Sequence, residues 1–258
     1  MMLLLLACVR DPTPSSVPAM TGGPVPSDAA PETPAAEPPA PAPPAHESPE
    51  IHESPEIIDK PIPFPQERKA LTQAYLTQHW GAEHMSGQLE ADITMEPRVI
   101  VLHWTAGPTA QGAWSTFSPT RLPGRPELQR AGALNVSAHF VVARDGTIWR
   151  LLPEDRVARH VIGMNHLSIG IENVGGIDGY PLTQAQVDAN AALVRHLKAA
   201  WPGITHLIGH LEYQQMEGHP YFQETDPNYR TVKPDPGVDF MTRVRALVDD
   251  LGLEGTPN

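Results

Sequence analysis

Short apolar runs that end in polar or glycine-rich sequence recur along the chain from residue 98 onward. The clearest is Val99-Ile100-Val101-Leu102, which is apolar at every position and rich in β-branched residues. Such a run indicates a buried strand. Arg144-Asp145-Gly146 separates two other runs and has the residues of a hairpin turn. The pattern therefore predicts strands at residues 98–103, 137–143, 147–152, 168–174 and 206–210.

Apolar residues at helical spacing predict helices at both ends of this region and within it. The first covers residues 66–79. The last covers residues 239–251, where Phe240, Val244 and Val248 share one face. A long amphipathic helix is expected from about residue 183 to about residue 200, with Thr183 as its N-cap. Residues 211–237 are predicted to form an irregular loop.

The predicted order is helix, strand, hairpin, strand, helix, strand, loop and helix. This order favours an α/β (mixed α+β) fold, in which a central mixed sheet is flanked by helices. Residues 66–258 are expected to form this domain, and residues 98–251 its core.

The first 65 residues have a different composition from the rest. They hold 17 of the 30 prolines and nine acidic residues against two basic ones. They also contain a direct repeat, His46-Glu47-Ser48-Pro49-Glu50-Ile51 followed by the same six residues. Sequence of this kind buries too little apolar surface to offset the entropy of ordering it. Residues 9–65 are therefore predicted to be a disordered, Pro-rich tether.

Residues 1–8 form a short apolar segment that ends in Leu5-Leu6-Ala7-Cys8. This ending resembles a bacterial lipobox, and a lipid on Cys8 would attach the protein to a membrane without a spanning helix. A chance cysteine in an apolar N-terminus is the alternative. The interpretation predicts a lipid-anchored, periplasm-facing protein of the bacterial cell envelope. Because Val9 follows the cysteine instead of Asp, the outer membrane is favoured over the inner one.

Charge and cysteine content exclude several classes of partner and site. The formal net charge is −12, of which the first 65 residues contribute −7 and the remainder −5. The folded part lacks the clustered Lys and Arg that form a positively charged surface for binding phosphate backbones. Nucleic acid is therefore not an expected partner. A single cysteine excludes a disulfide framework and a cysteine-rich metal site. The sequence has no run of about 18 apolar residues that would span a membrane.

Three side chains stand where apolar runs give way to polar sequence: His103, His210 and Asp235. Two neutral imidazoles and one carboxylate suit zinc and leave a fourth position open, as in catalytic zinc sites. Sequence spacing does not tie the histidines together, because they lie 107 residues apart. A histidine satisfied by ordinary hydrogen bonds is the alternative for each.

Segments between residues 99 and 239 resemble, in the same order, motifs of the zinc-dependent N-acetylmuramoyl-L-alanine amidases. This superfamily includes the phage-lysozyme-type amidases and the peptidoglycan recognition proteins. The matching segments are Val101-Leu102-His103-Trp104-Thr105-Ala106-Gly107, the hairpin at 136–148, Asn165 with Ser168-Ile169-Gly170-Ile171-Glu172, residues 182–186, Ile208-Gly209-His210, and Lys233-Pro234-Asp235-Pro236-Gly237.

The resemblance implies one zinc ion per domain, held by His103, His210 and Asp235. It implies that Glu172 is the general base and that Lys233 stabilises the tetrahedral oxyanion. A structural carboxylate and a solvated lysine are the respective alternatives. Phage-lysozyme-type members carry a catalytic Tyr where this chain has Ala138. A mechanism that uses Glu172 and Lys233 is therefore favoured over one that uses this Tyr.

The resemblance also implies contacts with substrate from Trp104, His160 and Asn165, although burial or a supporting role is the alternative for Trp104 and His160. Residues 114–134 and 213–232 look like insertions that wall the groove. The implied activity is hydrolysis of the amide between N-acetylmuramic acid and L-alanine in peptidoglycan, for cell-wall turnover or remodelling, by a monomer. A non-catalytic peptidoglycan-binding module is the alternative function, and a zinc amidase of a different amide is another.

Overall fold

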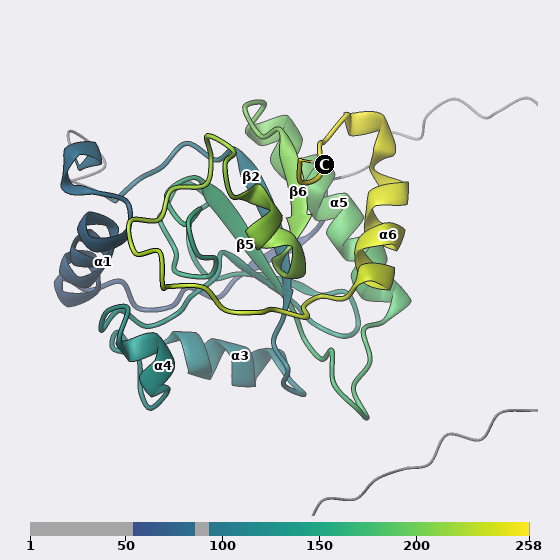
Figure 1. Ribbon diagram of the computed structural model, residues 1–258. Helices are drawn as coiled ribbons and strands as arrows, with labels where there is room; N and C mark the ends of the chain where they lie inside the picture. The colour runs from purple at the N-terminus through teal and green to yellow at the C-terminus, as the bar shows by residue number, and fades with distance from the viewer. Residues whose placement is uncertain (1–53, 86–92, 258) are drawn as a thin grey trace, which may run out of the picture. The chain divides into compact units, whose positions relative to one another are not determined.

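The computed structural model describes residues 54–85 and 93–257, and these contain one mixed sheet of six strands (Figure 1). The predicted lipobox at Cys8 and most of the predicted tether lie outside the described residues. The strands are β1 (Ile57–Asp59), β2 (Val99–Trp104), β3 (Phe140–Val142), β4 (Ile148–Arg150), β5 (Ser168–Asn173) and β6 (His206–Gly209). None of the helices in this part of the chain is long and apolar enough to cross a membrane.

The sheet has the order β1-β4-β3-β5-β2-β6, which puts β2 between β5 and β6. All neighbouring strands are parallel except the β3–β4 hairpin, so the predicted mixed sheet is confirmed. Because β2, β5 and β6 run in the same direction, their carboxyl ends meet at one edge. In open α/β sheets this edge is where ligands bind.

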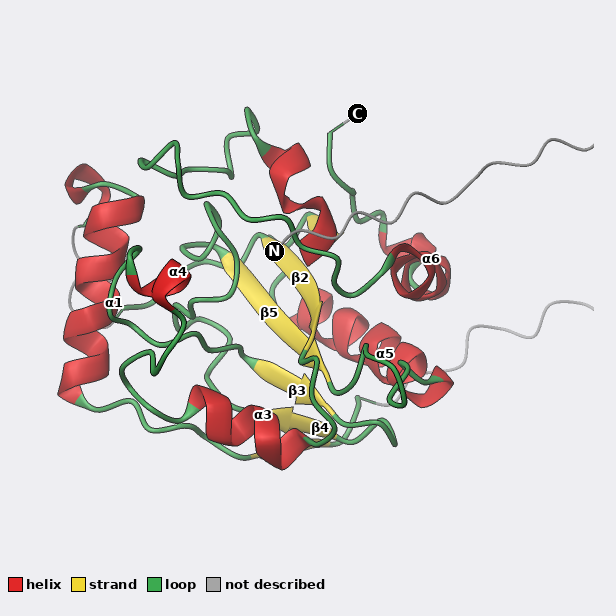
Figure 2. Cartoon of the chain, turned by 60° about the horizontal axis from the view of Figure 1, so that its bottom comes forward, coloured by secondary structure: helices red, strands yellow, loops and turns green. Residues whose placement is uncertain are grey.

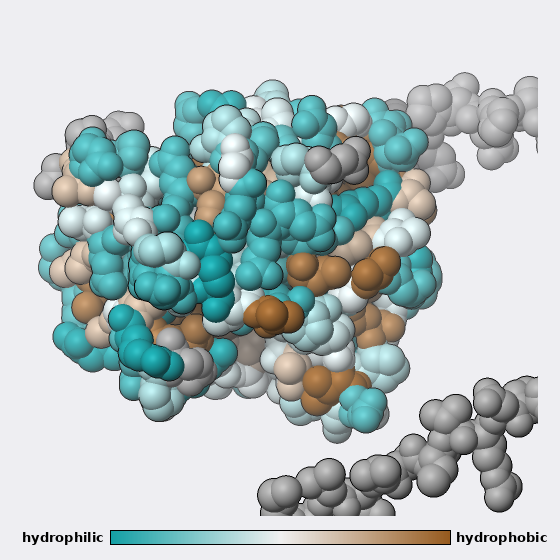
Figure 3. Space-filling model, viewed as in Figure 1, coloured by the Kyte–Doolittle hydropathy of each residue, from teal (hydrophilic) through white to brown (hydrophobic). Residues whose placement is uncertain are grey.

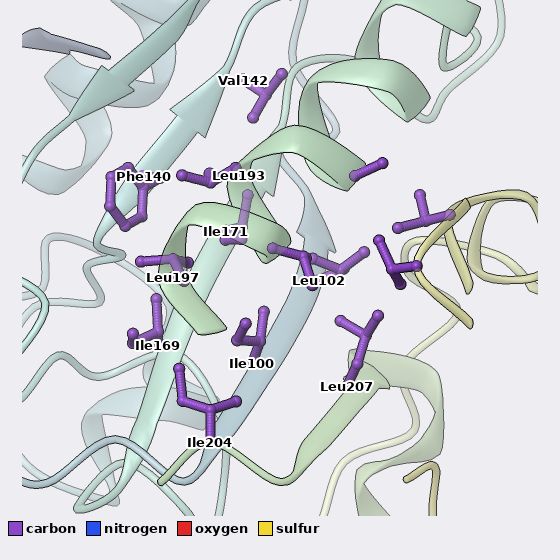
Figure 4. Packing of buried hydrophobic residues seen from close by; sticks show 14 of the residues in the cluster. Ile100, Leu102, Phe140, Val142, Ile169, Ile171, Leu193, Leu197, Ile204 and Leu207 are labelled. Carbon is purple, nitrogen blue, oxygen red and sulfur yellow. The ribbon is translucent and has the colours of Figure 1, made fainter. Parts of the chain in front are cut away.

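Alternate residues of β2 enter different layers of the core. Ile100 and Leu102 pack with Leu193 and Leu197 of helix α5 (Gln184–Ala200), as Figure 4 shows. Val99 and Val101 pack in a second cluster on the other face, and His103 follows them in the same alternation. Burial on both faces explains why this strand is apolar at every position.

Helices cover both faces of the sheet (Figures 1 and 2). Helices α5 and α6 (Val238–Leu247) lie on one face. Helix α3 (Ala110–Phe117) packs on the other face with Val141. The remaining helices are α1 (Gln66–His79), the short α4 (Pro126–Gln129) and the 3-10 turns Ala82–His84, His210–Met216 and Asp249–Leu251.

The sequence predicted the main elements well. Thr183 caps α5 as expected, and its side chain forms a reciprocal capping box with Gln186. The final helix ends at Leu247, and a separate 3-10 turn follows. Residues 211–237 are not wholly irregular, because a 3-10 turn extends from His210 to Met216.

The boundary predicted at Gln66 is too late. Strand β1 lies inside the segment that was predicted to be tether, where it pairs with β4 through Ile57 and Ile148. The following residues continue this contact, since the amide of Ile62 donates to the carbonyl of Leu151 at 3.1 Å and the Ile62 side chain is buried. A three-residue edge strand between prolines has no periodicity to recognise, and only its pairing partner stabilises it.

Candidate metal centre

His103, His210 and Asp235 come together at the carboxyl edge of the sheet, as predicted. All three are buried, and they form a group able to hold a metal ion. Nδ1 of His103 lies 2.9 Å from Nδ1 of His210 and 3.4 Å from Oδ2 of Asp235. Nδ1 of His210 lies 3.0 Å from the same carboxylate oxygen.

The three donor atoms fit a tetrahedral zinc site. Bonds of about 2.0–2.1 Å to one ion place tetrahedral ligand atoms roughly 3.3–3.4 Å apart. The observed triangle has sides of 2.9, 3.0 and 3.4 Å. A small adjustment of the side chains would therefore accommodate the ion.

Different elements position the three donors. His103 is in β2, and His210 follows β6 directly, so their parallel strands deliver them to the same edge. Asp235 comes from the loop before α6. Its carbonyl accepts a 2.7 Å hydrogen bond from the amide of Leu211, which fixes the loop beside His210.

The protonation states of the ligands suit metal binding. Burial, with the charge of His103, lowers the pKa of His210 to about 4, so that ring is neutral at pH 7. Burial acts to raise the pKa of Asp235, but contacts with His103 and His210 outweigh it and hold that pKa well below its ordinary value. The site therefore presents a neutral imidazole at His210 and an ionised carboxylate at Asp235, which are the forms of these groups that bind zinc.

Glu172 lies beside His103 because the two residues pair in register across β2 and β5. Burial and the nearby charge of Asp235 raise its pKa well above the ordinary value, against the opposing charges of Lys233 and Arg125. Its Oε2 atom is enclosed and accepts no hydrogen bond from the described residues. A carboxylate in this state is a stronger proton acceptor than one in water.

Glu172, Lys233 and the metal triad line one cavity of about 310 Å³. Trp104, His160 and Asn165 line it too, so the structure brings together all eight residues that the sequence indicated. Arg125 and Arg159 also line this cavity and were missed. Arg125 belongs to the segment predicted as an insertion, and its place between Gly124 and Pro126 was the only signal in the sequence. Its backbone is left-handed (φ 97°).

Two of the expected substrate contacts have internal partners. The side-chain oxygen of Asn165 accepts from the amides of His160 (2.8 Å) and Val161 (2.9 Å), and its nitrogen donates to the hydroxyl of Tyr75. Nδ1 of His160 lies 3.0 Å from Nε2 of His103. Burial, with the charges of His103 and His139, lowers the pKa of His160 well below its ordinary value. Substrate roles for both residues stay predictions.

Trp104 lines both the metal cavity and a second, more open cavity of about 370 Å³. Gly176 packs so closely on the indole that a Cβ there would lie 2.2 Å from Cδ2, which requires glycine. The second cavity is also lined by Pro236 and Gly237, which follow the ligand Asp235. Both cavities therefore lie beside the two chain segments that contain His103 and Asp235.

The segment between residues 105 and 135, which includes the predicted insertion at 114–134, lines the metal cavity and contains α3 and α4. Two buried arginines hold it. Arg68 donates to the carbonyls of Phe117, Ser118 and Pro119 at the end of α3. Arg159 donates to the carbonyl of Leu128 in α4 and to carbonyls after it.

The chain is similar in sequence to known amidases. Residues 93–237 match the family model of N-acetylmuramoyl-L-alanine amidase. The chain is 32% identical over 166 residues to the 1,6-anhydro-N-acetylmuramyl-L-alanine amidase AmpD of Salmonella typhimurium, covering 59% of this chain and 81% of that protein. It is 39% identical over 84 residues to the endolysin of Klebsiella phage KP32, covering 31% of this chain and 56% of the endolysin.

Among solved structures, the fold is similar to N-acetylmuramoyl-L-alanine amidase LysC from Clostridium intestinale URNW. The identity is 21%, the match covers 78% of this chain and 99% of that chain, and the TM-score is 0.47. The family model covers more than half of the chain and includes all three ligand residues and Glu172 and Lys233. The chain therefore belongs to the N-acetylmuramoyl-L-alanine amidase family.

Proposed function

We propose that the protein is a zinc-dependent hydrolase of the amide between N-acetylmuramic acid and L-alanine in peptidoglycan, acting in cell-wall turnover or remodelling. The observation that carries the proposal is the triangle of His103, His210 and Asp235 donor atoms in one cavity with Glu172 and Lys233. The family and its amidase relatives support the choice of bond.

The ligand triad would hold one zinc ion. When bound, the ion supplies Lewis acidity that polarises the scissile carbonyl and makes the attacking water more acidic. The residues around it do the remaining work. Glu172 accepts a proton from the water as its oxygen bonds to the carbonyl carbon, and it delivers that proton to the nitrogen of L-alanine as the carbon–nitrogen bond breaks.

Lys233 supplies positive charge where negative charge develops on the carbonyl oxygen. It lies two residues before Asp235 and lines the same cavity, and its charge acts on Glu172. An ammonium group in a site of restricted solvent access stabilises an oxyanion more strongly than it would in water.

The two cavities beside Trp104 accommodate the two sides of the bond. The metal cavity contains the basic side chains Arg125, Arg159 and Lys233, which suit the acidic stem peptide, whereas the more open cavity suits the sugar. Apolar side chains gather beside the start of α6 and the loop after β5 (Figure 3), and Ile177 and Val238 there are exposed. Apolar rims of this kind commonly mark binding grooves.

The test is cleavage of isolated sacculi, with released stem peptides identified by mass spectrometry. We expect His103→Ala and His210→Ala to abolish both zinc binding and peptide release. His196→Ala, a substitution on α5, is the control. Intact sacculi and 1,6-anhydro muropeptides should be assayed in parallel to identify the preferred substrate. Undiminished release by either ligand variant would refute the proposal.

The attachment to the cell envelope is a separate proposal. A lipid on Cys8 and the Pro-rich segment after it would let the domain reach the cell wall from the outer membrane. Metabolic labelling with a clickable fatty acid, compared between the natural protein and Cys8→Ser, tests this proposal. Equal labelling of the two proteins would refute it.

A further inference from the structure

His160 stands directly behind the metal ligand His103. Its Nδ1 lies 3.0 Å from Nε2 of His103, on the side of that ring away from the ligand triangle. The two rings meet edge to face, with an interplanar angle of 84°. His160 comes from the loop before β5, so a separate element holds the back of the ligand ring.

The other nitrogen of His160 can only donate. Nε2 lies 3.1 Å from the carbonyl oxygen of Ser168, and a carbonyl accepts but never donates. The hydroxyl of Ser168 also lies 3.2 Å from Nε2, but it gives its own proton to the carbonyl of Met164 at 2.7 Å. Neither partner can therefore supply a proton to Nε2.

This arrangement determines the tautomer of both histidines. In neutral His160 the proton is on Nε2, so Nδ1 is an acceptor. The hydrogen bond then requires that His103 carries its proton on Nε2. Nδ1 of His103 is left with a lone pair, and this is the atom that faces His210 and Asp235.

The sheet makes room for this ring. A Cβ on Gly170 of β5 would lie 2.7 Å from Cγ of His160, so any larger residue would displace the imidazole. Gly170 is itself fixed, because its amide donates to Nδ1 of buried His139 at 3.0 Å. The position of His160 is therefore set from two sides, by Ser168 and by Gly170.

We propose that His160 is a positioning residue, which holds His103 in the tautomer and orientation that bind the metal, and that it is not a substrate contact. The inference rests on the proposed zinc site. Partners behind a ligand histidine typically change metal affinity by about 10- to 100-fold.

The experiment compares the purified full chain with His160→Ala, His160→Gln and Gly170→Ala. Zinc dissociation constants are measured by competition with a chelating indicator at fixed pH. We expect His160→Ala to weaken zinc binding about 10- to 100-fold. Gly170→Ala should weaken it in the same direction while keeping the histidine. His160→Gln should recover part of the affinity, because its amide oxygen can accept from His103. His196→Ala on α5 should bind as the natural protein does.

Two further measurements separate positioning from substrate binding and from misfolding. Nitrogen-15 spectra of the zinc-free natural protein should show His103 protonated on Nε2, and His160→Ala should show a mixture of tautomers. At saturating zinc, KM for a muropeptide should be unchanged in His160→Ala. If that variant fails to fold, Gly170→Ala and His160→Gln decide the matter through the same measurements.

An unchanged zinc dissociation constant with a raised KM would overturn the inference and make His160 a substrate contact. His103 protonated on Nδ1 in the natural protein would also overturn it. Failure of the natural protein to bind zinc is a different result, because it would refute the proposed function itself.

Discussion

Replacing Glu172 with glutamine tests whether this catalytic side chain lowers the stability of the folded protein. The Oε2 atom of Glu172 is enclosed and accepts no hydrogen bond from the described residues, and burial with the charge of Asp235 raises the pKa of the group. Glutamine has the same shape and no charge. We therefore expect Glu172→Gln to stabilise the zinc-free protein while it abolishes or strongly reduces cleavage, a trade-off common at active sites.

The magnitude follows from the enclosed oxygen. An unsatisfied buried acceptor costs about 1–3 kcal/mol, more when it is charged. The glutamine amide also loses hydration there, so the expected gain is at the lower end, about 1–2 kcal/mol. For a domain of this size, each kcal/mol shifts Tm by about 2–4 °C, which gives a rise of about 2–8 °C. Loss of the general base should lower kcat by roughly 10²- to 10⁴-fold.

The stability difference should depend on pH with a defined sign. Below the ordinary glutamate pKa of 4.5, the carboxyl is protonated in both the native and the unfolded protein, and the difference is smallest. Above it, the unfolded chain releases the proton that the native protein retains, so the natural protein loses stability relative to Glu172→Gln as pH rises. The difference becomes constant once the pH exceeds the raised native pKa.

Thermal unfolding of the zinc-free proteins between pH 4 and pH 8 is the assay. Glu212→Gln is the matched control. Glu212 accepts hydrogen bonds from Arg245 and from the amide of Gly209, so its replacement should lower Tm. A Tm of Glu172→Gln equal to or below that of the natural protein across this range would refute the reasoning that Glu172 is held in an unfavourable environment.

Three other outcomes are expected. Lys233→Ala should lower kcat by roughly 10²- to 10³-fold with unchanged zinc content, and a loss of zinc measured by elemental analysis would show a structural role instead. Chelation should abolish cleavage and lower Tm, because an ion that binds only the native state stabilises it; zinc should restore both, and cleavage that persists in excess chelator would contradict a metal-dependent reaction. Arg68→Ala should lower the free energy of unfolding, measured in urea, by on the order of 3 kcal/mol, because Arg68 donates to three carbonyls at the end of α3. A decrease of less than 1 kcal/mol would show that other contacts hold α3 in place.

Helices and strands could be predicted from the sequence where their own residues have a characteristic pattern. Strand β2 is apolar at every position because both of its faces are buried, and α5 begins at a threonine with glutamine three residues later. Strand β1, helix α3 and helix α4 were missed, and neither β1 nor α4 has such a signal. Each of these two is three or four residues long and is held by partners distant in sequence, Leu151 for the segment after β1 and Arg159 for α4.

His160 shows what the sequence could not predict about the site. Its residue type and its place before Asn165 are compatible with a substrate contact or with a supporting partner. The distinction depends on which atoms face Nδ1 and Nε2, and those atoms belong to His103 and Ser168. A histidine's chemistry is set by the partners of its two nitrogens, and one-dimensional spacing contains no information about them.

The sequence by itself determined which residue types were offered: two imidazoles and a carboxylate where buried runs end, and a second carboxylate and a lysine in segments that resemble the family's motifs. Only the tertiary structure decided that they meet. Three parallel strands share a carboxyl edge, the β2–β5 register sets Glu172 beside His103, and the backbone bond from Leu211 draws Asp235 onto His210. The physical reason is that strand pairing, which is a contact between distant segments, converts a separation of 107 residues into one of 2.9 Å.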